Sequence, residues 1–398
     1  MTDHRLSRRD FITTAMTAAA AAGTLASAVA QDVNEQTIDK RVRIGVVGGG
    51  FGAGFHWHED PNCEVAAVSD LIPNRLQNLQ NRYGCEKTYP SLEEMIRDDT
   101  IDAIAVFTGA TDHVRHDIAV MNSGKHCISA VPAGVTLEEC AMLIEAKERT
   151  GMKYMMAETS YYRNSTITMR RMVDDGSFGE ILYSEGEYYH PSIGTSSSDL
   201  SRWPEKGPDA RTWRWGFPPM MYPTHSTGFL VGASRERLVE VSCIGTGSPE
   251  EAFQDNAYNS PFCNESALFK TDRGNMFRCN VMWNMWAHGE RAQWFGDKMA
   301  LLMPGWAGQP YAIRGADGTN IAARADYAHL LPEKMRYDSG HGGSHSFISH
   351  EFISAIAEDR EPAVDVYEAV AMTAPGLVAH ESSFRGGEQL RVPNFDPA

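Results

Sequence analysis

Three small residues and one acid in the first quarter of the chain have the types and spacing that suit a dinucleotide. Gly48, Gly50 and Ala53 fit the pattern G-x-G-x-x-G/A, which permits a tight turn, close approach of the backbone to a pyrophosphate, and close packing of a helix on a strand. Asp70 stands 22 residues after Gly48, where a carboxylate accepts hydrogen bonds from the adenosine ribose. The acid favours NAD because it repels a 2′-phosphate, whereas the nearby Arg75 leaves NADP open.

A βαβ unit is the structure that must hold these residues. Residues 42–47 form a short apolar run rich in β-branched side chains, which is typical of a buried parallel strand. A helix is expected directly after the glycines, with the pyrophosphate at its N-terminus, and residues 64–69 predict the second strand. The alternation continues, with strands expected at 101–107, 125–129 and 152–157 and helices at 73–83, 91–98, 114–122 and 132–150. Such alternation predicts a doubly wound parallel sheet.

Ligands of a doubly wound sheet bind beyond the carboxyl ends of its strands. This rule points to the segments 108–113, 130–132 and 158–163. Glu158 follows the last predicted strand of this sheet and would therefore lie near the cofactor. We interpret it as a candidate catalytic carboxylate.

The alternation of strand and helix stops near residue 160, and strands then follow strands. The long segment 191–220 contains three tryptophans and is interpreted as the rim of a substrate site or as a subunit contact. The expected elements are strands at 181–189, 239–245, 266–271, 276–283 and 390–392 and helices at 165–175, 346–357 and 366–383. The predicted fold class is α/β, with a Rossmann doubly wound parallel sheet followed by an α+β domain with a large open, mainly antiparallel sheet.

The N-terminal segment has the features of an export signal. Residues 7–12, Ser-Arg-Arg-Asp-Phe-Ile, resemble the twin-arginine motif, and an alanine-rich stretch and an Ala-Val-Ala cleavage site follow. Its apolar stretch is too weak for a membrane span. We expect a periplasmic protein, exported folded, with no span in the mature form. The predicted divisions are a signal peptide of residues 1–30, a linker of 31–40, a Rossmann domain of 41–160 and a C-terminal substrate and oligomerisation domain of 161–398.

Charge and cysteine usage limit the classes of partner. The net charge of −16 argues against a nucleic-acid partner. The seven cysteines are odd in number and widely spaced, with no C-x-x-C, which excludes a zinc ribbon and a disulfide scaffold. His341, His345 and His350 do not have the spacing of a zinc site. No metal is therefore expected.

Three segments resemble, in their order, the Gfo/Idh/MocA superfamily of sugar-active, nicotinamide-dependent proteins: IGVVGGGFGAGFH, VFTGATDHVRHDIAVMNSGKHCISAVPA and KYMMAETSYYRN. The resemblance covers nearly all of 41–398 and implies a carbohydrate substrate and a homo-oligomer paired through open sheet faces. Val131 replaces the lysine that is the usual catalytic residue of the family, so either another residue carries the proton, or the protein is not an ordinary dehydrogenase, or it does no chemistry. The resemblance completes the predicted cofactor set, which is Gly48, Gly50, Phe51, Gly52, Ala53, Asp70, Arg75, Thr108, His113, Ala130 and Pro132.

The string Tyr222-Pro223-Thr224-His225 is similar to glycoside hydrolase family 109, a branch that cleaves glycosides with bound NAD. Residues 131–133, 184–190 and 340–343 point the same way. The resemblance implies transient oxidation at C3 of the sugar, loss of the C2 proton with expulsion of the aglycone, addition of water, and reduction. The implied roles are His225 as the base at C3, Tyr189 or His190 at the later proton steps, Glu158 beside the cofactor, and Tyr161, Tyr222 and His341 at the sugar.

Two other functions agree with the same residues. The protein is a net sugar oxidoreductase, or a sugar–sugar oxidoreductase that recycles its nucleotide, if the oxidised sugar is released. It is a non-catalytic nucleotide- or sugar-binding protein if no residue replaces the missing lysine. Stoichiometry separates the three, because only a glycosidase releases an aglycone without net NADH.

Overall fold

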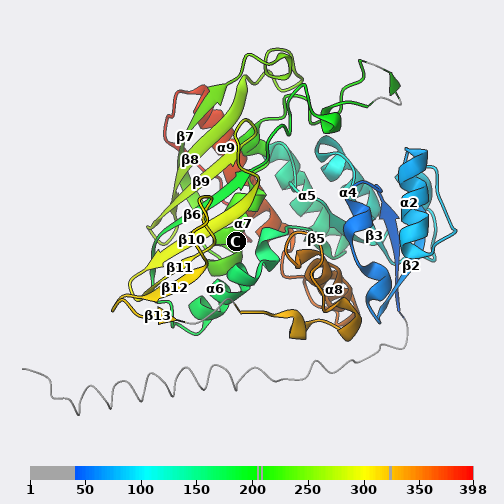
Figure 1. The fold of residues 1–398 in the computed structure, drawn as a ribbon. Coiled ribbons are helices and arrows are strands. Elements are labelled where there is room, and N and C mark those ends of the chain that lie inside the picture. The colour runs from blue at the N-terminus through cyan, green and yellow to red at the C-terminus, as the bar shows by residue number, and fades with distance from the viewer. Residues whose placement is uncertain (1–40, 204–205, 208, 322–324, 398) are drawn as a thin grey trace, which may run out of the picture. The chain divides into compact units, whose positions relative to one another are not determined.

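The computed structural model describes residues 41–203, 206–207, 209–321 and 325–397. The predicted signal peptide and linker lie outside the described residues. Among the described residues, no helix has the length and apolar character needed to cross a membrane. The elements fall into a five-stranded sheet and a nine-stranded sheet, each with its own helices (Figure 1).

The first sheet is parallel, with the order β2-β1-β3-β4-β5. Its inner strands carry apolar side chains at nearly every position because helices or loops cover both faces. Its elements are β1 Val42–Val47, β2 Cys63–Ser69, α2 Pro73–Tyr83, α3 Leu92–Met95, β3 Ala103–Val106, α4 His113–Asn122, β4 His126–Ser129, α5 Leu137–Thr150 and β5 Tyr154–Met156. The predicted doubly wound parallel sheet is confirmed.

The helix expected after the glycine turn is absent, and this prediction is wrong. Two short 3-10 turns, Gly52–Gly54 and Trp57–Glu59, occupy its place. Glycines have the poorest helix propensity after proline, and Pro61 follows before a full helix can be completed. The Tyr83 hydroxyl donates to the Gly52 carbonyl at 2.5 Å, which satisfies an acceptor that a helix would otherwise use.

The predicted helix at 132–150 begins later than expected. α5 starts at Leu137, after Thr136, whose side chain accepts a hydrogen bond from the Glu139 backbone amide at 3.1 Å. Residues 131–135 form a loop at the carboxyl end of β4 instead. This loop is therefore free to line a site at that edge of the sheet.

The second sheet is antiparallel except between β6 and β9, which are parallel. Its strand order is β13-β12-β11-β10-β6-β9-β8-β7-β14. Its strands are β6 Ile181–Tyr189, β7 Leu238–Gly247, β8 Phe262–Thr271, β9 Met276–Met282, β10 Gly289–Gly296, β11 Met299–Leu302, β12 Ala312–Gly315, β13 Asn320–Ile321 and β14 Leu390–Arg391. The associated helices are α6 Asn164–Asp174, α7 Thr224–Ser234, α8 Ser344–Ala357 and α9 Val366–Phe384. The large, mainly antiparallel sheet is confirmed.

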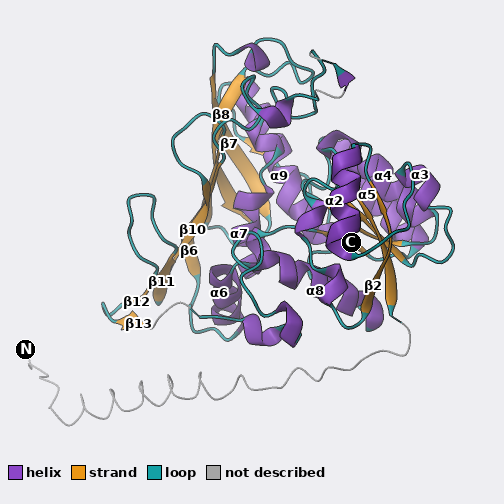
Figure 2. Ribbon diagram, turned by 45° about the vertical axis from the view of Figure 1, so that its right-hand side comes forward, coloured by secondary structure: helices purple, strands orange, loops and turns teal. Residues whose placement is uncertain are grey.

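Helices cover one face of the large sheet and connect it to the parallel sheet. α7 packs on β6, and α9 packs on β7 and also reaches α5 and β5 (Figures 1 and 2). The other face of the sheet carries no helix among the described elements. The segment before α9 returns to the first sheet, where the Met156 amide donates to the Val364 carbonyl at 3.0 Å. The domain boundary at 160 stays a prediction, because α9 contacts both sheets.

The cysteines are unpaired thiols. All seven are free and lie in the interior. This agrees with the interpretation of them as small apolar residues.

Candidate active site

A buried pair of side chains, Glu158 and His225, lies where the two sheets meet. Glu158 follows β5, and His225 is in the first turn of α7. The His225 Nδ1 atom lies 2.9 Å from the Glu158 Oε1 atom, and that oxygen also accepts the Ser160 backbone amide at 2.7 Å. Gly228 permits this close approach of α7, because a Cβ there would lie 2.4 Å from the Ser160 hydroxyl.

The two charges stabilise each other in a buried setting. Burial lowers the pKa of His225, but the Glu158 carboxylate outweighs burial and the pKa lies above its ordinary value. Burial likewise raises the pKa of Glu158, and His225 outweighs it, so that pKa lies below its usual range. Since a carboxylate accepts the Nδ1 proton, Nε2 is the nitrogen left for a substrate. The arrangement is that of a general base with a pKa tuned upward.

A second ion pair closes one side of this site. Arg163, directly before α6, donates from Nε and Nη2 to the Glu290 carboxylate at the start of β10. Ligand atoms of Glu158, His225 and Glu290 lie within 4.8 Å of one another. Two carboxylates and a histidine this close together favour a cation nearby, and the Arg163 guanidinium provides a positive charge beside them. The expectation of no metal stays a prediction.

Aromatic side chains surround the His225 ring. The ring centroid of Tyr188 lies 4.6 Å from it and that of Tyr222 lies 5.4 Å away. Burial raises the pKa of both phenols, so they stay neutral hydroxyls. Trp213 packs over Tyr222 and against Gly109 of the parallel-sheet half, where a Cβ would lie 2.6 Å from the indole. The segment 191–220 therefore reaches the site, as one of its two interpretations requires.

The structure does not bring Tyr189 or Tyr161 to His225. Tyr189 lies on the opposite face of β6, where it stacks on Trp306 at 4.9 Å. Tyr161 packs against α7, with the Arg170 guanidinium 3.7 Å from its ring centre. The predicted roles of both stay predictions, with their side chains placed away from His225. Strand alternation assigns the position at His225 to Tyr188 instead.

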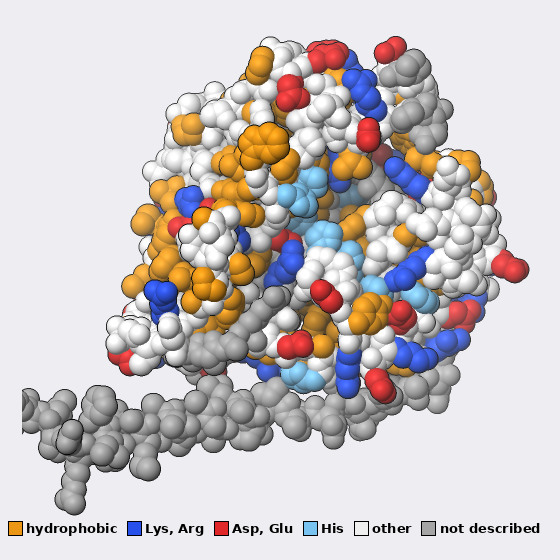
Figure 3. Space-filling view, viewed as in Figure 1, with side chains coloured by type: hydrophobic (Ala, Val, Ile, Leu, Met, Phe, Trp, Pro, Cys, Tyr) orange, Lys and Arg blue, Asp and Glu red, His pale blue; other side chains and the backbone are white. Residues whose placement is uncertain are grey.

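Two other predicted histidines lie at the edge of the site. His190 contacts the Tyr188 ring at 6.0 Å and the His288 ring at 4.8 Å, and burial together with His288 lowers the pKa of His190 to about 4. His341 stacks on His225 at 6.4 Å between ring centres and is exposed to solvent. Histidine side chains gather in the middle of the face shown in Figure 3, beside apolar side chains of the large sheet.

The glycine turn fits a dinucleotide. Gly48 has a φ of +97°, and a Cβ there would lie 2.1 Å from the Phe107 carbonyl oxygen. Beside Gly50 there is open space, with only the Arg75 guanidinium at 3.7 Å. Asp70 accepts the Gly49 amide at 2.5 Å and so holds the turn at the end of β2. A bare backbone next to a cation suits the pyrophosphate of NAD.

Several predicted cofactor residues hold together the loops that follow β3 and β4. The two ring nitrogens of the buried His113 lie 2.9 Å from the Pro132 carbonyl and 3.2 Å from the Thr108 carbonyl, so His113 joins two loops. Its predicted cofactor contact stays a prediction, and the hydrogen bonds of its ring show that it positions the two loops. The Ala130 amide donates to Val106, the Thr108 hydroxyl lies 2.9 Å from His116, and Ala53 is half-buried.

Phe51 and Gly52 connect the turn to the rest of the protein. A Cβ on Gly52 would lie 2.7 Å from the Phe107 ring, so this glycine serves packing. Phe51 makes edge contacts with His341 and His345 at 5.8 and 5.4 Å. The glycine turn and the His225 site are thus neighbours.

Some residues of the site were not among the predicted ones. Arg163, Tyr188, Glu290 and His345 complete it. Tyr188 was detectable in principle, because Gly186 two positions earlier marks the face of β6 that approaches a helix. A Cβ on Gly186 would lie 2.4 Å from the Ser226 carbonyl of α7.

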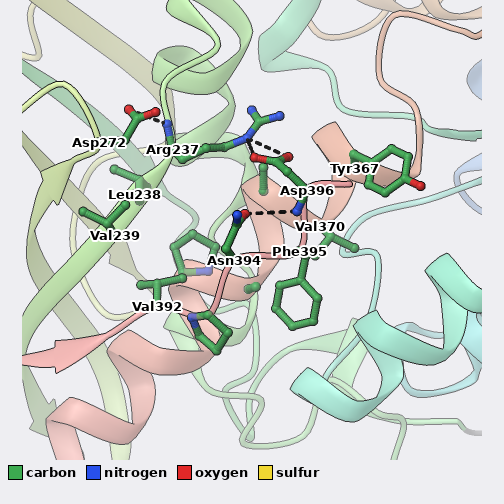
Figure 4. Close-up of a pocket in the computed structure, with 14 residues that line it drawn as sticks. Arg237, Leu238, Val239, Asp272, Tyr367, Val370, Val392, Asn394, Phe395 and Asp396 are labelled. Carbon is green, nitrogen blue, oxygen red and sulfur yellow. Dashed lines mark hydrogen bonds and ion pairs between the residues drawn. The ribbon is translucent and has the colours of Figure 1, made fainter. Parts of the chain in front are cut away.

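A separate pocket between β7 and α9 contains none of the predicted site residues (Figure 4). Its charged groups already have partners, since Arg237 pairs with Asp396 at 2.9 Å and with Glu368 at 2.6 Å. The pocket is therefore not the reaction site.

Comparison with known proteins agrees with this architecture. The model of the Gfo/Idh/MocA oxidoreductase family, NAD-binding Rossmann fold, matches residues 42–158. The model of the glycosyl hydrolase 109 C-terminal domain matches residues 321–398. A glycosyl hydrolase family 109 protein of Solibacter usitatus is 24% identical over 412 residues, covering 89% of this chain and 88% of the relative. One from Shewanella pealeana is 28% identical over 405 residues, with 89% and 85% covered.

Solved structures share the fold. Levoglucosan dehydrogenase in complex with NADH and levoglucosan superposes with a TM-score of 0.72 at 16% identity, covering 89% of this chain and 100% of that chain. Apo scyllo-inositol dehydrogenase from Lactobacillus casei gives 0.67 at 15% identity, with 89% and 99% covered. The solved structures show the fold, and the family match over 42–158 identifies an oxidoreductase-type enzyme with an NAD-binding Rossmann domain. Within that class, the resemblance to the glycoside hydrolase family 109 branch is confirmed.

Proposed function

We propose that this NAD-dependent enzyme acts on sugars and cleaves glycosides through transient oxidation at C3, with NAD retained through the cycle. The observation that carries the proposal is the buried Glu158–His225 pair, 2.9 Å apart, beside the glycine turn and inside a ring of aromatic side chains. The relatives named glycosyl hydrolase family 109 proteins support the choice of glycosides.

The residues of the turn would hold the cofactor, and when bound NAD supplies the oxidation and the later reduction of a sugar carbon. Gly48 and Gly50 provide the bare backbone, and Asp70 and Arg75 provide the charges around it. Val131 at the position of the family lysine cannot accept a proton. The proton must therefore leave through another side chain.

His225 is the side chain placed for that task. Its Nε2 atom accepts the proton of the C3 hydroxyl, and the Glu158 carboxylate stabilises the imidazolium that results. The site is buried, so this electrostatic stabilisation is stronger than in water. A base with a raised pKa captures the proton near neutral pH.

The surrounding groups serve the sugar and the later proton steps. The rings of Tyr188 and Tyr222 offer an apolar surface and hydroxyls to a pyranose face. His190 has a lowered pKa and is neutral at pH 7, which suits the removal of the C2 proton. The aglycone then leaves, and water takes its place.

The experiment that tests this proposal compares aglycone release with net NADH. The full chain is expressed for export, and its bound nucleotide is measured after denaturation. The protein is then incubated with a panel of aryl glycosides. Aglycone release without net NADH supports the proposal. Net NADH, or conversion of one sugar at the expense of another, would identify a sugar oxidoreductase. Binding of NAD with no turnover of any sugar would identify a binding protein.

We further propose that the protein reaches the periplasm by the twin-arginine route. The motif Arg8-Arg9 and the need to load a nucleotide before export support this. Replacing both arginines by lysine should leave the protein in the cytoplasm of a bacterial host. Export of the lysine variant at the normal level would contradict the proposed route.

A further inference from the structure

Two histidines link the His225 site to the glycine turn in a line of hydrogen bonds. The His341 Nδ1 atom lies 2.8 Å from the His345 Nε2 atom. The other nitrogen of His345, Nδ1, lies 2.9 Å from the carbonyl oxygen of Gly54, just after the glycine turn. The line thus runs from His341 at the sugar side, through His345, to the backbone of the cofactor side.

The line ends at a carbonyl oxygen, and this end determines which nitrogen of each histidine carries the proton. A carbonyl oxygen only accepts, so His345 must carry its proton on Nδ1. Burial and the neighbouring His341 lower the pKa of His345 to about 4, so its ring is neutral and Nε2 is an acceptor. His341 must then donate from Nδ1. Its Nε2 therefore carries a lone pair and no proton.

The packing holds both rings in place. His345 stacks on Phe55 with 4.7 Å between ring centres. Gly340 and Gly54 leave room for the ring, since a Cβ at Gly340 would lie 2.4 Å from it. His341 itself has a φ of +53°, in the left-handed region that side chains rarely adopt.

The charged and titratable groups near His341 pair with one another. Its electrostatic neighbours are His225, Glu290, Arg163 and Glu158, and desolvation and His225 lower its pKa first of all. Glu158 is hydrogen-bonded to His225, and Glu290 is paired with Arg163. His341, with its Nε2 unprotonated, therefore lies beside the His225 ring.

We propose that His345 is a positioning residue that holds His341 in the Nδ1–H tautomer, so that Nε2 of His341 accepts a hydrogen bond from a hydroxyl of the bound sugar. The inference rests on the proposed function for its ligand. The ligand class is a glycoside with a free hydroxyl next to the carbon whose hydroxyl His225 deprotonates. An analogue that lacks this hydroxyl, or that carries a methoxy group in its place, offers no hydrogen-bond donor to Nε2 of His341.

The matched variants are His345→Gln and His345→Phe in the full chain with bound NAD. A glutamine amide can donate to Gly54 and accept from His341, whereas phenylalanine keeps the stack on Phe55 and removes both bonds. Nitrogen-15 NMR of labelled histidine, assigned with His341→Asn, reports the tautomer without any turnover. We expect the Nδ1–H form in the native protein and in His345→Gln, and a mixture of tautomers in His345→Phe. A native His341 protonated on Nε2 would overturn the proposal.

Kinetics test the ligand. Loss of one hydrogen bond raises KM about tenfold in His345→Phe, with kcat little changed, and His345→Gln restores the native value. The deoxy analogue should show no such difference between native and His345→Phe protein. An equal rise of KM with the analogue, or a parallel loss of NADH affinity by fluorescence titration, would assign His345 a purely structural role. If the native protein shows the expected tautomer but turns over no glycoside, the proposed function is contradicted and the positioning role of His345 is not.

Discussion

Replacing Glu158 by glutamine removes the charge that tunes His225 and keeps the shape of the site. The two atoms are 2.9 Å apart, and both side chains are buried, with His225 5% exposed and Glu158 fully enclosed. Glutamine can still accept the Nδ1 proton, so the tautomer of His225 is retained. The substitution should therefore lower the pKa of His225 without changing its tautomer.

The size of this change follows from the hydrogen bond. A hydrogen bond to a charged group contributes about 1.5–3 kcal/mol and a neutral one about 0.5–1.5 kcal/mol, so the loss is about 1–1.5 kcal/mol; since one pKa unit corresponds to about 1.4 kcal/mol, the pKa of His225 should fall by about one unit. Below its pKa His225 is protonated and cannot act as a base, so kcat/KM falls as the pH drops through that value. In Glu158→Gln this acid limb should move to lower pH by the same amount.

The assay is the pH profile of kcat/KM for an aryl glycoside, with an NMR titration of His225 as a second readout that needs no turnover. The matched control is Glu265→Gln, which removes a carboxylate charge beside another histidine, because the buried Glu265 lies 2.9 Å from the half-buried His380. The control should leave the limb in place. An unchanged limb in Glu158→Gln, or an equal shift in the control, would refute the assignment of His225 as the base.

Three further substitutions give distinct outcomes. His225→Ala should lower kcat/KM by about 10²–10⁴-fold, the usual contribution of a general base, while the affinity for NADH measured by fluorescence titration is retained; normal turnover would exclude it as the base. Gly48→Ala places a Cβ 2.1 Å from a backbone oxygen and should abolish NADH binding. Its control, Gly84→Ala, has a φ of +59° and no atom within 4 Å of the new Cβ, so it should cost about 1–2 kcal/mol of stability from backbone strain and leave NADH affinity intact. Tyr188→Phe should reduce turnover of glycosides, whereas Tyr189→Phe on the opposite face of β6 should not; a larger loss in the second variant would contradict the assignment of faces.

The parallel sheet was predictable because its strands are buried on both faces. Such strands appear as continuous apolar runs, and β1 at Val42–Val47 shows this clearly. The helix α7 was not predicted, because all of its residues from Thr224 to Ser234 are buried and no polar face marks a helical period. β10 was missed because polar, ion-paired residues such as Glu290 take half-buried positions in it and hide the alternation of a strand.

Only part of the membership of the site could be predicted, and none of its pairings. Glu158 and His225 were both candidates, yet their contact joins residues 67 positions apart in the sequence. The alternation of β6 indicated that Tyr188 and Tyr189 face opposite ways, but not which of them faces α7. His345 reaches the cofactor side across 291 positions of the chain. Such long-range contacts depend on how the helices pack, which local patterns do not encode.

The most direct measurement is the deuterium content of the sugar released in D2O by the protein with its own bound NAD. Transient oxidation at C3 requires that the C2 proton be lost to solvent and regained from it. The account therefore predicts deuterium at C2 of each released sugar, with no net NADH. Aglycone release with an unlabelled C2 would indicate direct hydrolysis and would contradict the account.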